Sequence, residues 1–252
     1  MQTECLPETG EDGYNMDLSF WGASTGAAQL QTKLDTIANN IANINTFGYK
    51  SHNAIFADLL YDNIREPSGN ESILRQGRGA RVEKTDILFK QGAIQPTGLP
   101  LDFAITTDGF FAVENPRNGE TYYTRDGSFQ LSENINGEFN LITGSGYYVL
   151  DSNGQRIVVS DLNAQLDIGI YDFNHREGFH LMGNNLYQPV EKNGAVFLKQ
   201  DAEIERGMLE MSGVDLPLEM ARLIQTQRNF QMALRMVQTS DEIEGTVNNL
   251  RN

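Results

Sequence analysis

The sequence predicts an α+β fold, in which long N- and C-terminal helices pair as a discontinuous helical domain around a central, mainly antiparallel β domain. Three observations lead to this fold class. Apolar residues recur at helical spacing over residues 17–44, the period changes to two from Ala80 onward, and helical spacing returns after Gly213. Because the helical stretches lie at opposite ends of the chain, they can pack against each other only as one discontinuous domain.

The N-terminal helix is predicted over residues 17–44, with apolar positions that include Leu30, Leu34, Ile37, Ile41 and Ile44. Between them lie asparagines, which are poor helix formers and carry both a donor and an acceptor. These asparagines are Asn39, Asn40 and Asn43. Periodicity alone favours a slightly polar core helix, and the alternative is a helix surrounded by other chains. Gly48 is expected to supply a turn position without Cβ strain.

The pattern in the middle of the chain predicts a link followed by many short strands. Residues 52–63 fit either a further helical turn or an extended arm, and residues 66–79 form a Gly/Pro/Ser-rich link. Strands are expected within 81–84, 86–89, 91–94, 97–105, 109–114, 121–131, 139–142, 146–150 and 155–159, and a third group over 166–198 adds strands at 168–171 and 196–198. Asn-Gly and Asp-Gly pairs between them, such as Asn118-Gly119 and Asp126-Gly127, are typical of antiparallel hairpins.

The C-terminal helix is predicted from about Val214, with Asp215 as its cap and Pro217 in its first turn. Its apolar residues follow at three- and four-residue steps: Met220, Leu223, Ile224, Phe230, Leu234 and Val237. Ile243, Val247 and Leu250 then drift around the cylinder, which indicates contacts on more than one side. The methionines of residues 208–236 fit an adaptable partner surface and a plain helix core equally well.

These patterns divide the chain into an N-terminal tail (1–16), a terminal-helix assembly domain (17–50 and 208–252), a linker or extended arm (51–79) and a central β domain (80–207). The net charge of −15 argues against a nucleic-acid partner and against docking on anionic lipid. No apolar run is long enough to insert into a membrane, and residues 1–15 lack the pattern of a cleavable signal peptide. The single cysteine, Cys5, excludes an intrachain disulfide.

No set of residues carries a recognisable catalytic or metal-binding pattern. His175, Arg176, Glu177 and His180 match no zinc spacing and are expected in a surface loop. Asp102 and Asp126 are carboxylates of the kind that hydrolases pair, but Asp126-Gly127 is better explained as a turn. We therefore expect no enzyme activity, no cofactor and no bound metal.

Several blocks, in the correct order, resemble the axial (rod and hook) protein family of the bacterial flagellum. They are LDTIANNIANINTFGYK (34–50), FADLLYDNIREP (56–67), GLPLDFAITTDGFFAVENP (98–116), YTRDGSF (123–129), GNNLY (183–187) and GMLEMSGVDLPLEMARLIQTQRNFQMALRMVQTSDEI (207–243). The sequence departs from the family pattern at Leu99, at Ser212-Gly213 and at Phe230.

The resemblance is nearest to the distal-rod branch of this family. It implies a structural subunit of the flagellar basal-body rod, which polymerises helically into the tubular drive shaft that carries motor torque to the hook. A hook or proximal-rod subunit is the alternative within the family, and a carbohydrate-acting β-domain enzyme is the alternative of another class.

The implied partners are further copies of the chain in a helical homopolymer, other rod and hook proteins, and the flagellar export apparatus. The implied location is the basal body in the cell envelope, reached by type III export without signal cleavage. The residues expected to make subunit contacts are Leu34, Ile37, Asn39, Asn40, Ile41, Asn43, Ile44, Met220, Leu223, Phe230, Leu234 and Val237.

Overall fold

The computed structural model describes residues 11–58, 61–63, 75–77, 80–134, 137–161 and 166–251, with backbone only for 11–19, 58, 61–63, 75–77, 80 and 251. Cys5, most of the predicted tail and residues 64–74 and 78–79 of the predicted link lie outside this description. The chain separates into two compact units. We call residues 1–38, 53–85 and 220–252 the helical unit, and residues 39–52 and 86–219 the β unit.

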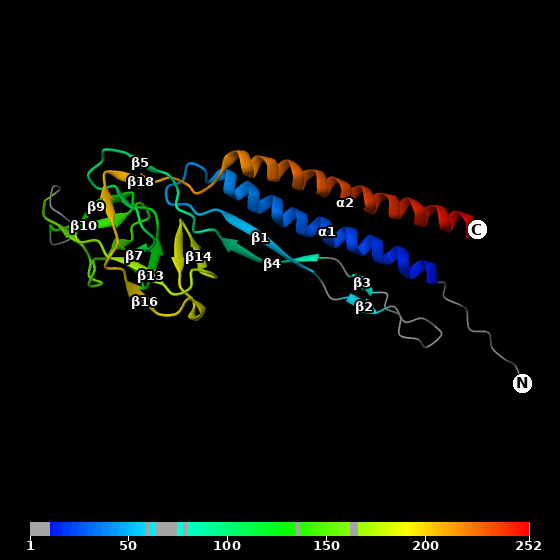
Figure 1. The fold of residues 1–252 in the computed structure, drawn as a ribbon, viewed down its shortest axis with the longest axis horizontal. Coiled ribbons are helices and arrows are strands. Elements are labelled where there is room, and N and C mark those ends of the chain that lie inside the picture. Colours follow the sequence, from blue (N-terminus) through cyan, green and yellow to red (C-terminus); the bar gives the residue numbers. More distant parts are fainter. Residues whose placement is uncertain are drawn as a thin grey trace, which may run out of the picture. The chain divides into compact units, whose positions relative to one another are not determined.

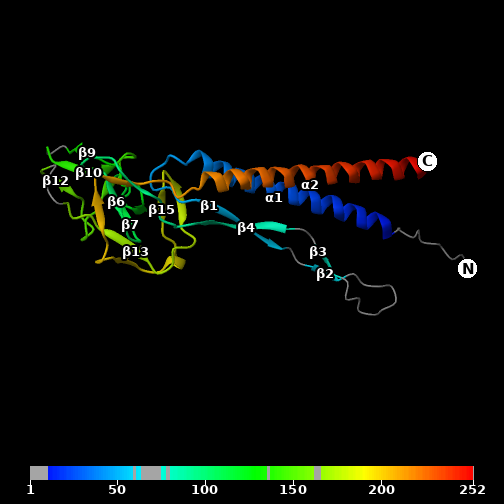
Figure 2. The same ribbon diagram turned by 45° about the horizontal axis from the view of Figure 1, so that its top comes forward.

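The helical unit contains most of α1 (Glu11–Ala42) and α2 (Leu216–Arg251). The two helices run antiparallel and side by side in both ribbon views (Figures 1 and 2). The fold class predicted from the sequence is thus confirmed. The boundaries of α1 differ from the prediction, because the helix begins at Glu11, inside the predicted tail, and ends at Ala42.

Short strands complete the helical unit. β1 (His52–Asp58) pairs with β4 (Ala80–Ile87), and β2 (Tyr61–Asn63) pairs antiparallel with β3 (Arg75–Gly77). The stretch 52–63, which the sequence left open between helix and extended arm, therefore contains strands. The amide of Val82 donates to the side-chain oxygen of Gln29 at 2.8 Å, so β4 is tied to α1.

The β unit is built around one ten-stranded sheet in which all the recorded pairs are antiparallel. Its main path runs β12-β10-β11-β7-β8-β15-β14, with β9 beside β10 and with β13 between β7 and β16. The strands are β7 (Phe110–Glu114), β8 (Thr121–Thr124), β9 (Phe129–Glu133), β10 (Phe139–Thr143), β11 (Tyr148–Val149), β12 (Val158–Val159), β13 (Ile170–Phe173), β14 (His180–Gly183), β15 (Leu186–Gln188) and β16 (Val196–Leu198).

Two further pairs bring the end of the β unit back to its beginning. β17 (Ile204–Arg206) pairs with β6 (Phe103–Ile105), and β18 (Met208–Glu210) pairs with β5 (Ile94–Pro96), both antiparallel. The short helix η1 (Glu191–Asn193) lies between β15 and β16. Residues 94–96 and 208–210 are thus neighbours in space although they are far apart in the sequence.

The core of the β unit lies on both faces of β7. Phe111 and Val113 pack into one cluster with Leu141 and other apolar residues, while Phe110 and Ala112 pack into a second, aromatic cluster on the opposite face. Successive side chains of a strand point to opposite faces, so a strand buried on both sides reads as a continuous apolar run. This explains why the sequence Phe-Phe-Ala-Val lacks the alternation of a half-buried strand.

Candidate functional site

One stripe of buried and half-buried positions on each of α1 and α2 follows a seven-residue pattern. On α1 the positions are Ala23, Ala27, Leu30, Leu34 and Ile37, and on α2 they are Leu223, Thr226, Phe230, Ala233, Val237 and Ser240; all are buried or half-buried. Steps of alternately three and four residues keep such positions in one stripe along a helix pair. We call these residues the helix seam. Small Thr226, Ala233 and Ser240 alternate along it with larger side chains.

A second set of apolar residues on α2 is exposed. Met232, Met236, Ile243 and Val247 are 61%, 59%, 50% and 49% exposed. Their spacings of four and seven residues place them on one line along the helix, to one side of the seam. We call these four residues the apolar flank of α2. The residues predicted from the sequence for subunit contacts do not include these four, although the Met-rich composition and the drift of Ile243 and Val247 were the available signals.

The residues predicted for subunit contacts fall into three groups. Ile37 and Asn40 are buried. Half-buried positions are Leu34, Ile41, Asn43, Ile44, Leu223, Phe230 and Val237, and exposed ones are Asn39, Met220 and Leu234. Their role in subunit contacts stays a prediction, and the structure shows what they do within one chain.

Asn40 joins the end of α1 to the first strand residue. Its amide nitrogen donates to the carbonyl of His52 at 2.8 Å, and its oxygen accepts from the His52 amide at 2.9 Å. The Tyr49 hydroxyl donates to the same oxygen at 3.1 Å. Asn43 instead donates to its neighbour Asn39, at 2.7 Å to the side-chain oxygen. These asparagines therefore satisfy polar groups inside the chain where the helix ends.

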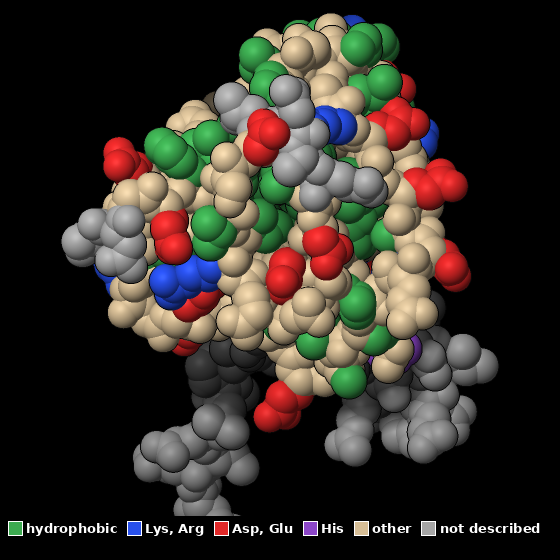
Figure 3. Space-filling model, turned by 90° about the vertical axis from the view of Figure 1, so that its left-hand side faces the viewer, with side chains coloured by type: hydrophobic (Ala, Val, Ile, Leu, Met, Phe, Trp, Pro, Cys, Tyr) green, Lys and Arg blue, Asp and Glu red, His purple; other side chains and the backbone are tan. Residues whose placement is uncertain are grey.

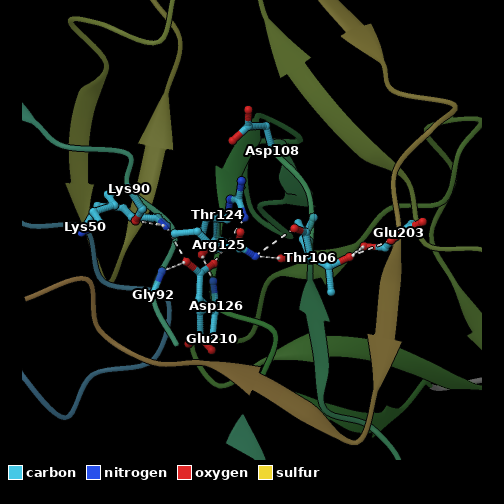
Figure 4. Close-up of polar contacts among 12 residues, drawn as sticks. Lys50, Lys90, Gly92, Thr106, Asp108, Thr124, Arg125, Asp126, Glu203 and Glu210 are labelled. Atoms are coloured by element: carbon cyan, nitrogen blue, oxygen red, sulfur yellow. Dashed lines mark hydrogen bonds and ion pairs between the residues drawn. The ribbon is translucent and has the colours of Figure 1, made fainter. Parts of the chain in front are cut away.

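Three charged side chains meet inside the β unit, and we call them the Glu210 cluster (Figure 4). Lys50 Nζ lies 2.5 Å from one carboxylate oxygen of Glu210, and Arg125 Nη1 lies 3.3 Å from the other. The side chains of Lys50, Arg125 and Glu210 are only 1%, 5% and 1% exposed. Lys50 also donates to the carbonyl of Lys90 at 2.9 Å, and the Gly92 amide donates to Glu210 at 2.8 Å.

Burial has the largest effect on the pKa values of the two cations in this cluster. It lowers the pKa of Lys50 and of Arg125, while the negative charge of Glu210 acts in the opposite direction on both. It also raises the pKa of the Tyr187 hydroxyl and raises that of Tyr49 to about 12. A buried cation loses its hydration, so the charged forms of Lys50 and Arg125 depend on the partners that the fold provides.

The chain around the cluster is closely packed. Gly48 has φ +66, and a Cβ built there would lie 2.5 Å from the backbone carbon of Arg125. The expectation that Gly48 supplies a turn position is thus confirmed, and close approach is a second reason for glycine. Glu210 is the last residue of β18, and Asp215, directly before α2, caps that helix by accepting from the Leu218 amide at 3.2 Å. The predicted cap is confirmed.

The Glu210 cluster unites three of the sequence blocks on which the resemblance rests. Lys50 ends the first block, Arg125 lies in YTRDGSF, and Glu210 lies in the C-terminal block. Sequence reasoning did not single out these three residues for any role. All three carry a charge, but nothing in the local pattern shows that they meet.

The residues considered for catalysis have structural partners. Asp126 accepts from the amide and the hydroxyl of Ser128 at 3.0 and 2.8 Å, as in an Asx turn, and burial raises the pKa of its carboxyl group. Thr97 donates to Asp102 at 2.5 Å. Arg176 pairs with Asp172 at 2.6 Å and with Asp108 at 3.1 Å. Among the described residues, no group of His, Cys, Asp and Glu has the arrangement of a metal site.

A groove of about 540 Å³ in the β unit has few groups of the kind that glycoside hydrolysis uses. Among the described residues of its lining, one is a carboxylate, Asp167, which accepts from Ser152 at 2.5 Å. Two cations of the lining are likewise engaged, Lys199 with the carbonyl of Asp108 and Arg206 with that of Pro100. A glycosidase acts with a pair of carboxylates, so the groove offers no support for the carbohydrate-acting alternative.

Acidic side chains are spread over the face of the β unit shown in Figure 3, whereas Lys and Arg appear at few points. The described residues of this face therefore form no basic patch of the kind that binds nucleic acid. Of the helices that the structure describes, none has the length and apolar character needed to span a bilayer.

Comparison with known proteins gives consistent matches along the chain. Residues 23–50 match the family described as flagella basal body rod protein. Residues 104–172 match the flagellar hook protein FlgE/F/G D1 domain, and residues 205–250 match the flagellar basal body rod FlgEFG protein C-terminal.

Individual relatives cover nearly the whole chain. The flagellar basal-body rod proteins FlgG of Borreliella burgdorferi and Bacillus subtilis are both 32% identical to it, covering 92% of this chain and 98% of the relative. The flagellar basal-body rod protein FlgF of Mesorhizobium japonicum is 33% identical, covering 93% of this chain and 98% of its own length. The chain therefore belongs to the flagellar basal-body rod protein family.

Proposed function

We propose that this protein is a structural subunit of the distal, FlgG-type part of the bacterial flagellar rod. It polymerises helically with further copies of itself and contacts other rod and hook proteins. The resulting tube carries motor torque to the hook. In this proposal the chain reaches the basal body through the flagellar export apparatus without signal cleavage.

The exposed apolar flank of α2 is the observation that carries the proposal. A single helix pair in water gains little from apolar side chains that stay exposed, and contiguous exposed apolar residues mark interaction sites. Packing the flank against a neighbouring subunit would bury Met232, Met236, Ile243 and Val247. Methionine adapts its shape to different neighbours, which suits repeated contacts in slightly different surroundings.

Helical polymers need heterologous contacts that do not close. Two of the predicted assembly residues that are exposed in one chain, Met220 and Leu234, lie on α2 away from the apolar flank. A heterologous contact joins two different surfaces, because each subunit binds one neighbour on each side. The apolar flank and the surface around Met220 and Leu234 would supply these two surfaces.

A paired substitution tests the proposal. Met236→Glu with Val247→Glu places charges on the apolar flank, and Arg235→Glu is the matched control, because it makes the same change in net charge at an exposed position on another face of the same helix. We expect the wild type and the control to form elongated assemblies at high concentration, as seen by sedimentation and negative-stain electron microscopy. The paired variant should stay monomeric with an unchanged far-ultraviolet circular dichroism spectrum. Assembly of the paired variant to the wild-type extent would contradict the proposal.

Another position in the rod or hook is the second candidate, because the FlgF relative is as similar in identity as the FlgG relatives. Cryo-electron microscopy of isolated basal bodies separates the two. Density for this chain in the distal rod supports the first candidate, and density in the proximal rod or hook supports the second.

A further inference from the structure

The Glu210 cluster joins residues that lie very far apart in the sequence. Glu210 is 160 positions after Lys50 and 85 positions after Arg125. A chain made from its N-terminus therefore contains both cations long before their carboxylate exists. Contacts of such separation close large loops, and they form late because loop closure must precede any gain from the contact.

Residues 207–213, which we call the latch segment, are held from two sides. On one side the Gly48 amide donates to the Glu210 carbonyl at 2.8 Å, and the Gly213 amide donates to the Tyr49 carbonyl at 2.9 Å. On the other side β18 pairs with β5, and the Met211 amide donates to the Ala93 carbonyl at 2.8 Å. The fit is tight, because a Cβ at Gly92 would lie 2.1 Å from the Met211 carbonyl oxygen.

The two core clusters of the β unit do not include the latch segment. Their buried members lie between Phe103 and Leu186 in one cluster and between Phe110 and Tyr187 in the other. The apolar core of the sheet can therefore form from residues that precede the latch segment. What this segment adds is a counter-charge, one buried apolar side chain, Leu209, and the closure of the chain around Lys50.

Among the described residues, the anions that act on Lys50 and Arg125 are Glu210 and Asp108, so without Glu210 the two buried cations would keep only Asp108. Within the described part of the chain, Arg125 Nε already has no hydrogen-bond partner. Asp108 contributes a favourable charge to Lys50 and Arg125, but its side chain is 57% exposed and pairs with Arg176. Removing one partner of a buried ion pair is strongly destabilising because the remaining charge is left uncompensated.

We propose that the latch segment closes the β unit in a separate, late step of folding, and that neutralisation of Lys50 and Arg125 by Glu210 drives this step. Before closure the sheet core is formed, while residues 48–51 and 90–96 are not yet fixed. Closure fixes both segments at once, together with the residues directly before α2. The proposal is independent of the rod function proposed above, since it concerns a single chain.

Refolding of the full chain from urea, followed by pulsed hydrogen exchange and mass spectrometry, tests this step. Peptides covering 48–51, 90–93 and 207–213 report closure, and peptides covering 110–114 and 121–124 report the sheet core. In the wild type we expect the closure peptides to become protected at least tenfold more slowly than the core peptides. Protection of both sets in one phase would overturn the proposal.

Charge variants show whether Glu210 drives closure. Glu210→Gln keeps the shape and removes the charge, and Glu205→Gln is the matched control on the exposed side of β17. We expect Glu210→Gln to reduce protection of the closure peptides at least tenfold and to change core protection less than twofold. Behaviour of Glu210→Gln equal to that of the control would overturn the proposal.

A double variant separates charge from packing and keeps the test valid if Glu210→Gln fails to fold. Lys50→Met combined with Glu210→Gln leaves a single buried cation in place of two. If uncompensated charge opens the latch, the double variant regains closure protection relative to Glu210→Gln. If loss of shape or hydrogen bonds were responsible, the double variant would be no better protected than the single one, and the proposal would be wrong.

Discussion

The β unit and helix α2 differ in how far they bury their apolar side chains. In the β unit, Phe110 and Phe111 are 1% and 0% exposed, and the aromatic rings of Phe89, Phe173 and Phe179 surround Phe110. On α2, the apolar flank stays about half exposed or more. One region completes its core with its own chain, whereas the other keeps apolar surface that its own chain does not cover. In the proposed function, folding and assembly therefore rest on different parts of this molecule.

The largest expected effect lies in the core of the β unit. Phe111→Ala should lower the free energy of unfolding by about 3–5 kcal/mol, because it leaves a cavity beside Phe129 in a closed core. Phe139→Ala is the matched control, since that ring is 46% exposed at the sheet surface, and it should change the same quantity by less than about 1 kcal/mol. Urea titrations of both variants measure the difference. Equal losses would remove the distinction between core and surface.

A smaller effect is expected where α1 ends. Asn40→Ala should lower the free energy of unfolding by about 1–3 kcal/mol, because the amide and carbonyl of His52 both lose their partner. Asn39→Ala, one residue earlier and exposed, should have an effect of about 0.5 kcal/mol or less. Thermal unfolding of the pair checks this. If the two alanine variants had the same melting temperature, Asn40 would not be the residue that joins helix to strand.

Still smaller is the expected effect of a change on the apolar flank. Met236→Gln should alter the free energy of unfolding by no more than about 0.5 kcal/mol, because this side chain is 59% exposed in the single chain. Chemical unfolding of the monomer at low concentration provides the measurement. A loss of several kcal/mol would show that the flank belongs to the core of the chain, and the contrast with the β unit would then fail.

The smallest effect concerns pH. Burial lowers the pKa of His52 below its ordinary value of 6.5. The unfolded chain therefore takes up a proton first as pH falls, so the stability that His52 contributes is present above pH 6.5 and decreases below it. His52→Phe keeps a ring next to Tyr49 and removes the titration. Between pH 7 and 5.5 the free energy of unfolding of His52→Phe should fall less steeply than that of the wild type. Equal slopes would show that titration of His52 does not cause the pH dependence.

Much of the fold follows from local pattern. The period of 3.6 at both ends and the period of two between them predicted the helices and most strands, including β7, β8, β9, β10 and β16. Gly48 and Asp215 were predicted to hold a turn and a cap, and they do so because turns and caps depend on neighbouring residues alone. The sequence did not predict β14 as a strand, because His180–Gly183 is an exposed segment that carries no alternation.

What the sequence by itself determined is therefore the order and type of the elements, the acidic character of the chain and its family, since these depend on composition, period and motif. Only the tertiary structure decided which charges meet and which apolar residues stay uncovered. Nothing in the local sequence distinguishes buried Asn40 from exposed Asn39, or joins Glu210 to Lys50 across 160 positions. Such pairings depend on how distant segments come together, and that is set by packing of the whole chain.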